Sequence, residues 1–272
     1  MHKVAGLKPP SPVLRVTEML RAAGEMRSLL VTNPLLRALP RGAGQPVLVI
    51  PGFGTTDGST YVLRRYLRKW GYRPETWAQG LNRGFRQRLL QGVEDRLRHI
   101  HERSGQAVSI VGQSLGGIYA RELARRNPAL VRQVITLGSP FGGPDGAAPL
   151  VGKIYDRLNP DAQVRSEFED MERLRELIEQ APPVPASAIY SRGDGVVSWR
   201  ACVQLNGCRH SENIEVHGSH CGMGVNPAVL YVIADRLAWD SGEWRPFNRA
   251  GWRALVYPEA VRAQSNLCRA EL

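Results

Sequence analysis

One serine of the sequence stands in a setting typical of a catalytic nucleophile. Ser114 is the centre of "GQSLG" (residues 112–116), which follows an apolar run and precedes an amphipathic stretch. A turn this tight between a strand and a helix strains its central residue and leaves no room for a side chain two positions before or after it. The pattern predicts an exposed hydroxyl that attacks a carbonyl carbon. A plain strand-to-helix loop is the simpler alternative.

Such a hydroxyl needs a histidine that takes its proton. Four of the six histidines fall in a terminal tail, a basic helix or a polar loop, where we expect solvent exposure: His2, His99, His101 and His210. Between the remaining two, we favour His220 as the general base. It follows a Gly-Ser turn and precedes two more glycines, which let a loop fold over the sheet edge. His217 falls where the strand is still ending.

A carboxylate must orient the histidine, and Asp194 is the candidate. It follows the apolar run of "AIYSRGDGVV" and lies between two glycines, although a simple Asp-Gly turn would look the same. Asp145 and Glu215 are rivals. Neither has the strand-then-turn setting before the histidine, so we expect Asp194 to complete the triad.

The tetrahedral intermediate of acyl transfer also needs N–H donors for its oxyanion. One is expected from Leu115, the residue after the nucleophile, and the other from Phe53 in the "PGFG" turn. The alternative for that turn is an ordinary Pro-Gly reversal.

Strands and helices alternate around these residues. Apolar runs predict strands at 46–53, 72–78, 107–112, 133–139, 186–191 and 213–218. Helical spacing predicts helices at 58–71, 84–104, 115–126 and 226–239, the last with Asn226 as N-cap and Pro227 in its first turn. This alternation indicates an α/β protein with a mostly parallel central sheet flanked by helices, whose catalytic groups gather at the carboxyl ends of the strands.

Together these motifs resemble the α/β-hydrolase superfamily, nearest to its bacterial lipase and esterase branch. The resemblance covers about residues 45–240 and is carried by "VSIVGQSLGGIYARELA", "RQVITLGSPF", "SRGDGVVSWRAC" and "ENIEVHGSHCGMGVNPAVLYVIADRLA". It implies a sheet of about six to eight strands, Ser-Asp-His chemistry and no cofactor. Two departures stand out: Gln113 replaces the usual His or Trp and would reshape the substrate pocket, and the oxyanion turn begins with Pro51 rather than His-Gly.

Two further segments flank this core. With 272 residues, we expect one domain that carries an N-terminal helical extension at about 11–40 and a helical insertion at about 144–185. The insertion would cover the serine as a lid, or would pack as a helical excursion without a gating role. The basic amphipathic extension would rest on an anionic membrane surface or pack against the core.

The composition limits which binding partners and which cellular location we expect. The net charge of +11 favours anionic partners, but the basic residues are spread over helices without interleaved aromatics, so nucleic-acid binding is not expected. The four cysteines lack metal-ligand spacing, and Cys202 and Cys221 are the first pair to test for a bridge. No apolar run is long enough to span a membrane and no secretory signal is evident, which makes a cytoplasmic location the default.

The sequence thus predicts a serine hydrolase that cleaves small-molecule or lipid esters through an acyl-enzyme. Three alternatives remain: an acyltransferase with the same triad, a non-catalytic binding module on the same fold, and an amidase or peptidase.

Overall fold

A parallel sheet forms the centre of the molecule in the computed structural model, which describes residues 7–142, 147–158, 179–239, 244–262 and 264–265. Its strands lie in the order β2-β1-β3-β4-β5-β7, and every neighbouring pair is parallel. Their bounds are Pro46–Ile50 (β1), Arg73–Thr76 (β2), Val108–Gln113 (β3), Val131–Leu137 (β4), Ala186–Tyr190 (β5) and Ser211–Glu215 (β7). The expected α/β class with a mostly parallel sheet is confirmed.

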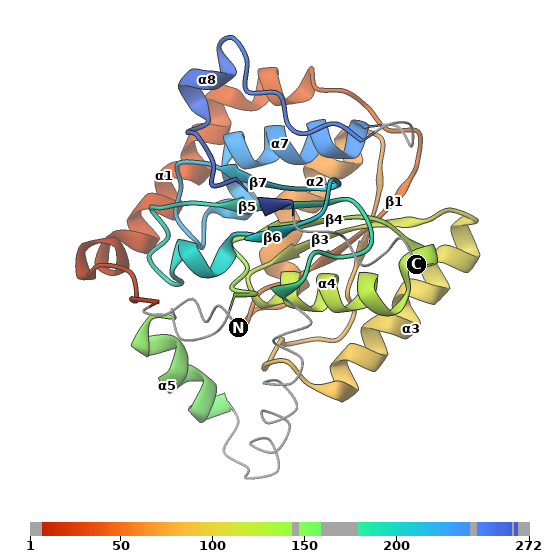
Figure 1. Cartoon of the computed structure of the whole chain (residues 1–272), viewed down its shortest axis with the longest axis horizontal. Coiled ribbons are helices and arrows are strands. Elements are labelled where there is room, and N and C mark those ends of the chain that lie inside the picture. The colour runs from red at the N-terminus through yellow and green to blue at the C-terminus, as the bar shows by residue number, and fades with distance from the viewer. Residues whose placement is uncertain (1–6, 143–146, 159–178, 240–243, 263, 266–272) are drawn as a thin grey trace.

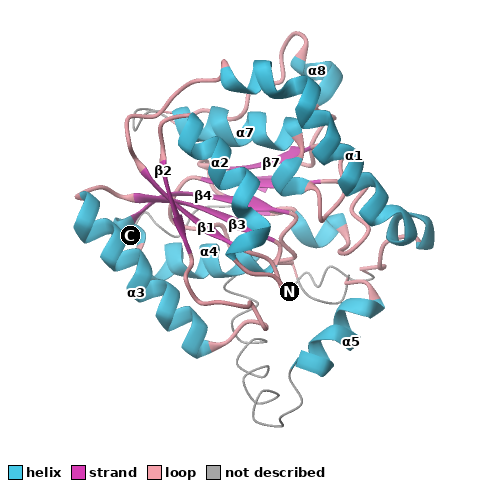
Figure 2. Cartoon of the chain, turned by 180° about the vertical axis from the view of Figure 1, so that it is seen from behind, coloured by secondary structure: helices cyan, strands magenta, loops and turns pink. Residues whose placement is uncertain are grey.

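Helices cover both faces of this sheet (Figure 1). On one face lie α1 (Pro12–Arg37), α2 (Tyr61–Lys69) and α7 (Pro227–Ala238), and on the other lie α3 (Gln87–Ser104) and α4 (Leu115–Arg126). Figure 2 shows the same two layers from behind. Because the sheet is covered on both sides, its central strands are buried on both faces, and β1 and β5 are continuous apolar or small-residue runs.

Two apolar clusters hold the layers together. One joins α2 and α7 to the sheet and includes Trp70, Ile135 and Ile233, while the other joins α3 and α4 to the opposite face and includes Leu97, Ile110 and Tyr119. Burial of apolar side chains at about 25 cal/mol per Å² is the main force that fixes both layers. Shorter elements complete the fold: α5 (Pro149–Leu158), α8 (Arg253–Val256), β6 (Asn206–Gly207), β8 (Gln264–Ser265), η1 (Asp57–Thr60), η2 (Pro128–Leu130), η4 (Trp199–Cys202) and η5 (Met223–Val225).

Local sequence signals set several helix ends. The Asn226 side chain accepts hydrogen bonds from the first N–H groups of α7, and Pro227 follows at the first helical position, as the sequence predicts. Gly105 ends α3 with a φ of 66°, a left-handed conformation that costs glycine little. Ser11 caps α1 in the same way as Asn226 caps α7.

Several predicted boundaries differ from the structure by two or three residues, and for two of them the reason can be identified. The last strand of the sheet ends at Glu215, not at 218, because the backbone N–H and C=O of Gly218 both bond to the Ser191 hydroxyl, at 3.1 and 2.7 Å, instead of to a neighbouring strand. The helix α3 begins at Gln87, not at 84. Its leading residues are held by Tyr119, whose hydroxyl donates to the carbonyl of Gly84 and accepts from the N–H of Arg86.

The expected insertion at 144–185 falls largely outside the described residues. Its first helical pattern corresponds to α5, whereas the second, "SEFEDMERLRELIEQ", lies almost entirely outside them. A role as a lid therefore stays a prediction. None of the helices in the described ranges is both long and apolar enough to cross a membrane.

The proposed bridge between Cys202 and Cys221 is wrong, because both thiols are free. Cys202 is buried with Tyr190 and Val203, whereas the backbone N–H of Cys221 bonds to Glu18. Cys208 is disulfide-bonded. Disulfides are more typical of oxidising compartments than of the cytoplasm, so the cytoplasmic location stays an untested expectation.

Candidate active site

Ser114 lies between the end of β3 and the start of α4. Its backbone has φ 51° and ψ −122°, one of two non-glycine residues with positive φ in the described part of the chain. Such a conformation costs about 1–3 kcal/mol and persists only where the surroundings impose it. Here the Ser114 N–H bonds to the carbonyl of Leu137 at the end of β4, at 2.8 Å. The serine is therefore presented at the carboxyl edge of the sheet, as the sequence predicts.

Two glycines make this sharp turn possible. A Cβ atom at Gly112 would lie 2.4 Å from the carbonyl oxygen of Gly116, and a Cβ at Gly116 would lie 2.3 Å from the carbonyl oxygen of Ile50. Neither approach is tolerable for a carbon atom, and both neighbours are backbone, which cannot swing aside. The requirement for glycine on both sides of the serine thus has a direct steric cause.

The "PGFG" turn packs beside the serine. A Cβ atom at Gly52 would lie 3.3 Å from the Cβ of Ser114, so the turn that contains Phe53 lies against the nucleophile elbow. Leu115 is the first residue of α4, and N–H groups in a first helical turn have no acceptor within the helix. The two expected oxyanion donors therefore belong to segments that flank the same serine.

Asn82 fixes the shape of this turn, and sequence reasoning missed it. It is fully buried, and its side chain donates to the carbonyl of Pro51 at 2.9 Å. Its backbone accepts from the N–H of Gly54 and donates to the carbonyl of Thr55. One asparagine thus anchors both ends of the turn from a loop almost thirty residues farther along the chain.

Asp194 and His220 form a buried pair. Nδ1 of His220 lies 2.6 Å from Oδ2 of Asp194, and the side chains are 8% and 1% exposed. The other carboxylate oxygen accepts the N–H groups of Val196 and Val197, both at 2.8 Å. Because an ionised carboxylate can only accept, the Nδ1–H group of His220 donates to Asp194 in this pair. Nε2 is then the unprotonated nitrogen of the neutral ring.

The histidine lies next to the elbow. Its Nδ1 is 3.1 Å from the position of a Cβ at Gly138, the residue after Leu137, and its backbone carbonyl accepts from the Gln113 side chain at 3.4 Å. Among the described residues, the hydrogen bonds of His220 include none to the Ser114 hydroxyl. Catalytic hydrogen bonds of this kind are often long in ligand-free enzymes and shorten when substrate binds.

The electrostatics of the pair favour a basic imidazole. Burial opposes the charged ring and lowers the pKa of His220, but the charge and hydrogen bond of Asp194, helped by the charge of Glu18, outweigh it. The net result is a pKa above the usual value of 6.5. A histidine of this kind accepts a proton readily once the solution is alkaline enough to leave it neutral.

The rival residues lie elsewhere. Glu215 accepts hydrogen bonds from the Tyr190 hydroxyl and from Arg192, away from the imidazole. His217 is exposed, and its backbone carbonyl accepts a hydrogen bond from the Asn226 side chain. Asp145 lies outside the described residues. Of the candidates for acid and base that are described, the structure brings together Asp194 and His220.

Comparison with known proteins agrees with this geometry at the level of fold. No protein-family model and no curated protein sequence matches the chain. Solved structures do. A monoacylglycerol lipase from Paleococcus ferrophilus matches 72% of this chain and 96% of its own, with a TM-score of 0.51 and 16% identity. The chain has the α/β-hydrolase fold.

Two other structures give the same result. Lipase B from Aspergillus fumigatus matches 75% of this chain and 57% of its own, with a TM-score of 0.53 and 20% identity. Lipase BlEst2 from Bacillus licheniformis matches 74% of this chain and 94% of its own, with a TM-score of 0.51 and 15% identity. The shared α/β-hydrolase fold places the carboxyl ends of β3, β5 and β7 at one edge of the sheet, which is where Ser114, Asp194 and His220 follow their strands.

The helix α1 adds a feature to this hydrolase fold that sequence reasoning missed. Glu18 bridges the two loops that carry Asp194 and His220. Its Oε2 accepts from the N–H of Gly195, at 3.0 Å, and its Oε1 accepts from the N–H of Cys221, at 2.8 Å. These are the residues directly after Asp194 and directly after His220, so one buried carboxylate fixes the spacing between the two loops.

Arg21 and Glu25 bond to the residues directly before Asp194 and His220 in the same two loops. Arg21 donates to the carbonyl of Gly193, before Asp194, at 2.6 Å, and also pairs with Glu18. Glu25 accepts from both the N–H and the hydroxyl of Ser219, before His220. Residues 18, 21 and 25 share one face of α1. We call these three side chains the α1 clamp.

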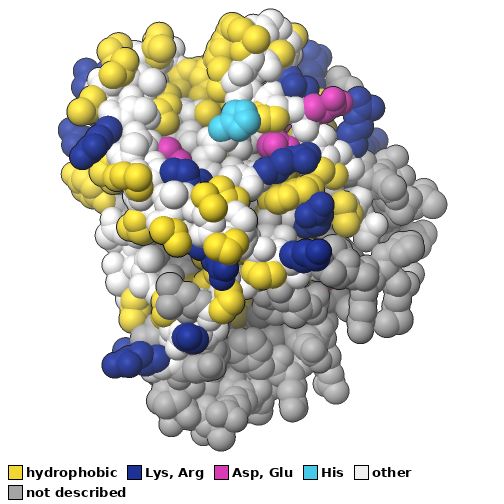
Figure 3. Space-filling view, turned by 90° about the vertical axis from the view of Figure 1, so that its left-hand side faces the viewer, with side chains coloured by type: hydrophobic (Ala, Val, Ile, Leu, Met, Phe, Trp, Pro, Cys, Tyr) yellow, Lys and Arg dark blue, Asp and Glu magenta, His cyan; other side chains and the backbone are white. Residues whose placement is uncertain are grey.

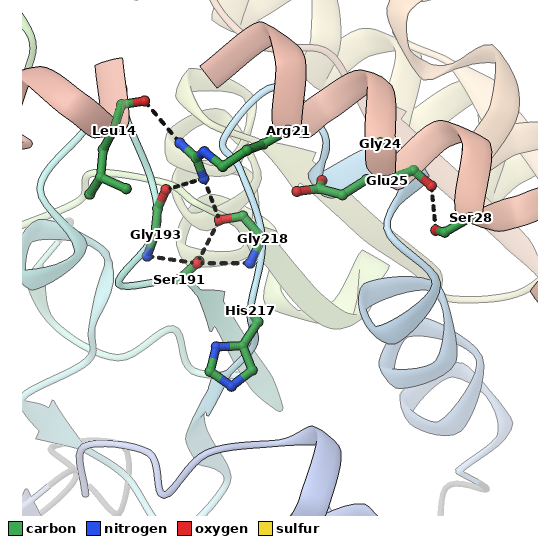
Figure 4. Close-up of a pocket in the computed structure, with 9 residues that line it drawn as sticks. All are labelled: Leu14, Arg21, Gly24, Glu25, Ser28, Ser191, Gly193, His217 and Gly218. Carbon is green, nitrogen blue, oxygen red and sulfur yellow. Dashed lines mark hydrogen bonds between the residues drawn. The ribbon is translucent and has the colours of Figure 1, made fainter. Parts of the chain in front are cut away.

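A groove of about 590 Å³ runs along the clamp (Figure 4). Arg21 and Glu25 line it on one side and Gly193 and Gly218 on the other, while His217 points away from the helix. Burial raises the pKa of Glu25 more than its bonds to Ser219 lower it. The groove therefore lies between α1 and the loops that carry Asp194 and His220.

Two remaining expectations concern ligands. Gln113, expected in the substrate pocket, directs its side chain to the backbone of the His220 loop, and its contact with substrate stays a prediction. In the described ranges, no group of three His, Cys, Asp or Glu side chains is placed to bind a metal ion.

Proposed function

We propose that this protein is a serine hydrolase that cleaves carboxylic esters through an acyl-enzyme intermediate. The observation that carries the proposal is the buried Asp194–His220 pair beside a serine held in a strained turn. A strained serine alone, or a buried His-Asp pair alone, has structural explanations. The three together on one sheet edge are the arrangement that activates a hydroxyl group.

In the first half of the reaction, Nε2 of His220 removes the proton from the Ser114 hydroxyl as its oxygen attacks the ester carbonyl. The carbon–oxygen double bond opens, and the negative charge moves to the former carbonyl oxygen. Asp194, held by two backbone N–H groups, keeps the imidazole in the required tautomer and stabilises its cation. The N–H groups of Leu115 and Phe53 are the proposed donors to the oxyanion.

In the second half, the imidazolium gives its proton to the leaving alcohol, and the acyl group stays on Ser114. Water then attacks the acyl-enzyme while His220 again accepts a proton, and the acid is released. An acyltransferase would differ only here, because an alcohol in place of water would take the acyl group.

Two observations support the proposed class of substrate. Several similar structures are lipases by name, and the insertion expected at 144–185 contains an amphipathic helix, α5, with Ile154 exposed. An apolar cover over the site would favour acyl chains by about 0.8 kcal/mol for each buried methylene. We therefore propose small-molecule or lipid esters as substrates.

A series of p-nitrophenyl esters of increasing acyl length tests the proposal. We expect the wild-type protein to hydrolyse at least part of the series, and Ser114→Ala to lose turnover by several orders of magnitude with an unchanged melting temperature. Added alcohols separate the two acyl acceptors, since a hydrolase releases mainly free acid and an acyltransferase mainly new ester. Equal turnover by Ser114→Ala and wild type would refute the serine mechanism.

A further inference from the structure

The solvent side of α1 is unusually apolar. Its most exposed large side chains are 70–84% accessible: Val13, Val16, Leu20, Leu30, Val31 and Leu35. Positions 13, 16, 20, 31 and 35 recur at helical spacing and form a stripe along the helix. The buried residues Glu18, Leu29 and Leu36 mark the opposite side. Arg27 falls on the same stripe and Leu30 lies at its edge. We call this stripe, with Arg27 and Leu30, the outer face of α1.

The inner side of α1 explains why the helix stays in place despite this exposure. The α1 clamp ties it to the loops of Asp194 and His220, and Leu29 and Leu36 join the core around α2 and α7. These inward contacts fix the helix, so its outer face points to solvent. Monomeric proteins seldom expose so continuous an apolar surface without a partner for it.

Charge on α1 is divided between its two sides. The helix contains two acidic residues, Glu18 and Glu25, and both bond inward to the catalytic loops. Two of its four arginines, Arg27 and Arg37, are exposed. Figure 3 shows hydrophobic side chains interspersed with Lys and Arg on the side of the molecule where α1 lies, with few acidic groups. The outer face combines apolar and positive groups and lacks compensating acids from its own helix.

We propose that the outer face of α1 docks the protein onto a lipid bilayer that carries anionic headgroups. Exposed aliphatic side chains enter the boundary between headgroups and acyl chains, and the arginines meet lipid phosphates. A second copy of the chain fits this face poorly. In a two-fold pair of α1 helices, Arg27, near the middle of the helix, would approach its own symmetry mate.

Docking by the outer face would leave the loops of Asp194 and His220 about one helix diameter from the lipid, about 10 Å, because the clamp residues lie on the opposite side of α1. The inference concerns binding and does not depend on the proposed esterase function. A binding assay can therefore fail or succeed separately from an activity assay.

Vesicle co-sedimentation of the full-length protein provides the test. We expect wild-type protein to sediment with vesicles of equal parts phosphatidylcholine and phosphatidylglycerol, and much less with phosphatidylcholine alone or in high salt. The triple variant Leu20→Gln, Leu30→Gln, Val31→Gln keeps good helix formers at exposed positions, and should partition at least about tenfold more weakly. Its melting temperature serves as the check on folding.

A matched pair of arginine variants tests the charge. Arg27→Gln on the outer face should weaken binding about fivefold, whereas Arg88→Gln, exposed on α3 across the sheet, removes the same charge and should bind like wild type. Absence of wild-type binding to the anionic vesicles overturns the proposal, as does a folded triple variant that binds as tightly as wild type. A solution dimer that the triple variant dissociates also overturns it, because the face would then be a self-interface.

Discussion

Replacing Glu18 by glutamine probes the link between α1 and the catalytic loops. The carboxylate accepts from Gly195 with one oxygen and from Cys221 with the other, and the first oxygen also pairs with Arg21. Glutamine has a single acceptor oxygen, so its amide N–H₂ must face one of these donors. At least one charge-assisted bond is lost in a site where the side chain is only 6% exposed.

The size of the effect follows from that bond. A hydrogen bond to a charged group contributes about 1.5–3 kcal/mol. Loss of this bond lets the Asp194 and His220 loops shift relative to each other. If the whole free-energy loss appears in the transition state, kcat falls about 10- to 150-fold, since about 1.4 kcal/mol corresponds to tenfold. We expect a loss of stability of the same order, which a melting curve measures separately.

The pH profile distinguishes a purely structural effect from an effect on the base. His220 must be neutral to accept the serine proton, so activity falls as the pH drops through its pKa. Glu18 is one of the charges that raise this pKa. Its neutralisation lowers the pKa, and the acid limb of kcat/KM moves to lower pH in Glu18→Gln.

A control variant separates the loss of this particular carboxylate from the loss of any negative charge. Asp95→Asn removes an exposed carboxylate on α3, and we expect the wild-type rate and the wild-type acid limb. The reasoning is refuted if folded Glu18→Gln shows both the rate and the acid limb of wild type, because the clamp would then have no influence on the catalytic pair.

Two further substitutions, with Gly24→Ala as a control, test the turn at Ser114 and the proposed acid Asp194. Gly116→Ala should abolish or strongly reduce the yield of folded protein, because its Cβ would lie 2.3 Å from the Ile50 carbonyl oxygen, whereas Gly24→Ala in α1 meets nothing within 4 Å and should stabilise by about 0.5–1 kcal/mol, as thermal melting will show. Asp194→Asn should lower kcat on the order of 10⁴-fold with little change in KM, because an amide N–H₂ facing Nδ1 of His220 favours the wrong tautomer; a steady-state rate within tenfold of wild type would contradict this role.

Local signals in the sequence were sufficient for the sheet and for the elbow. The central strands β1, β3 and β4 are short segments rich in apolar residues, and Asn226-Pro227 marks the start of α7 as expected. The "GQSLG" motif determines its own geometry, because only glycine fits beside the backbone of β1 at position 116. Ser114, Asp194 and His220 could be placed at one sheet edge because each lies in the segment that follows the carboxyl end of a strand.

The α1 clamp could not be predicted in the same way. Glu18 and Arg21 bond to residues more than 170 positions farther along the chain, and nothing local identifies their partners. The spacing of 18, 21 and 25 does indicate one polar helix face, but an ordinary solvated face has the same pattern. Similarly, the free state of Cys202 depends on how the chain folds after β5, which no cysteine spacing records.

The central claim is that Ser114 is an activated nucleophile, and covalent labelling tests it most directly. A fluorophosphonate reacts with a serine only where a base accepts the proton, and intact mass with peptide mapping locates the adduct. The account predicts one adduct, on Ser114 in the wild-type protein, none in Ser114→Ala and a greatly slowed reaction in His220→Ala. An unlabelled wild-type protein, an adduct on another residue, or equal labelling rates with and without the imidazole would contradict it.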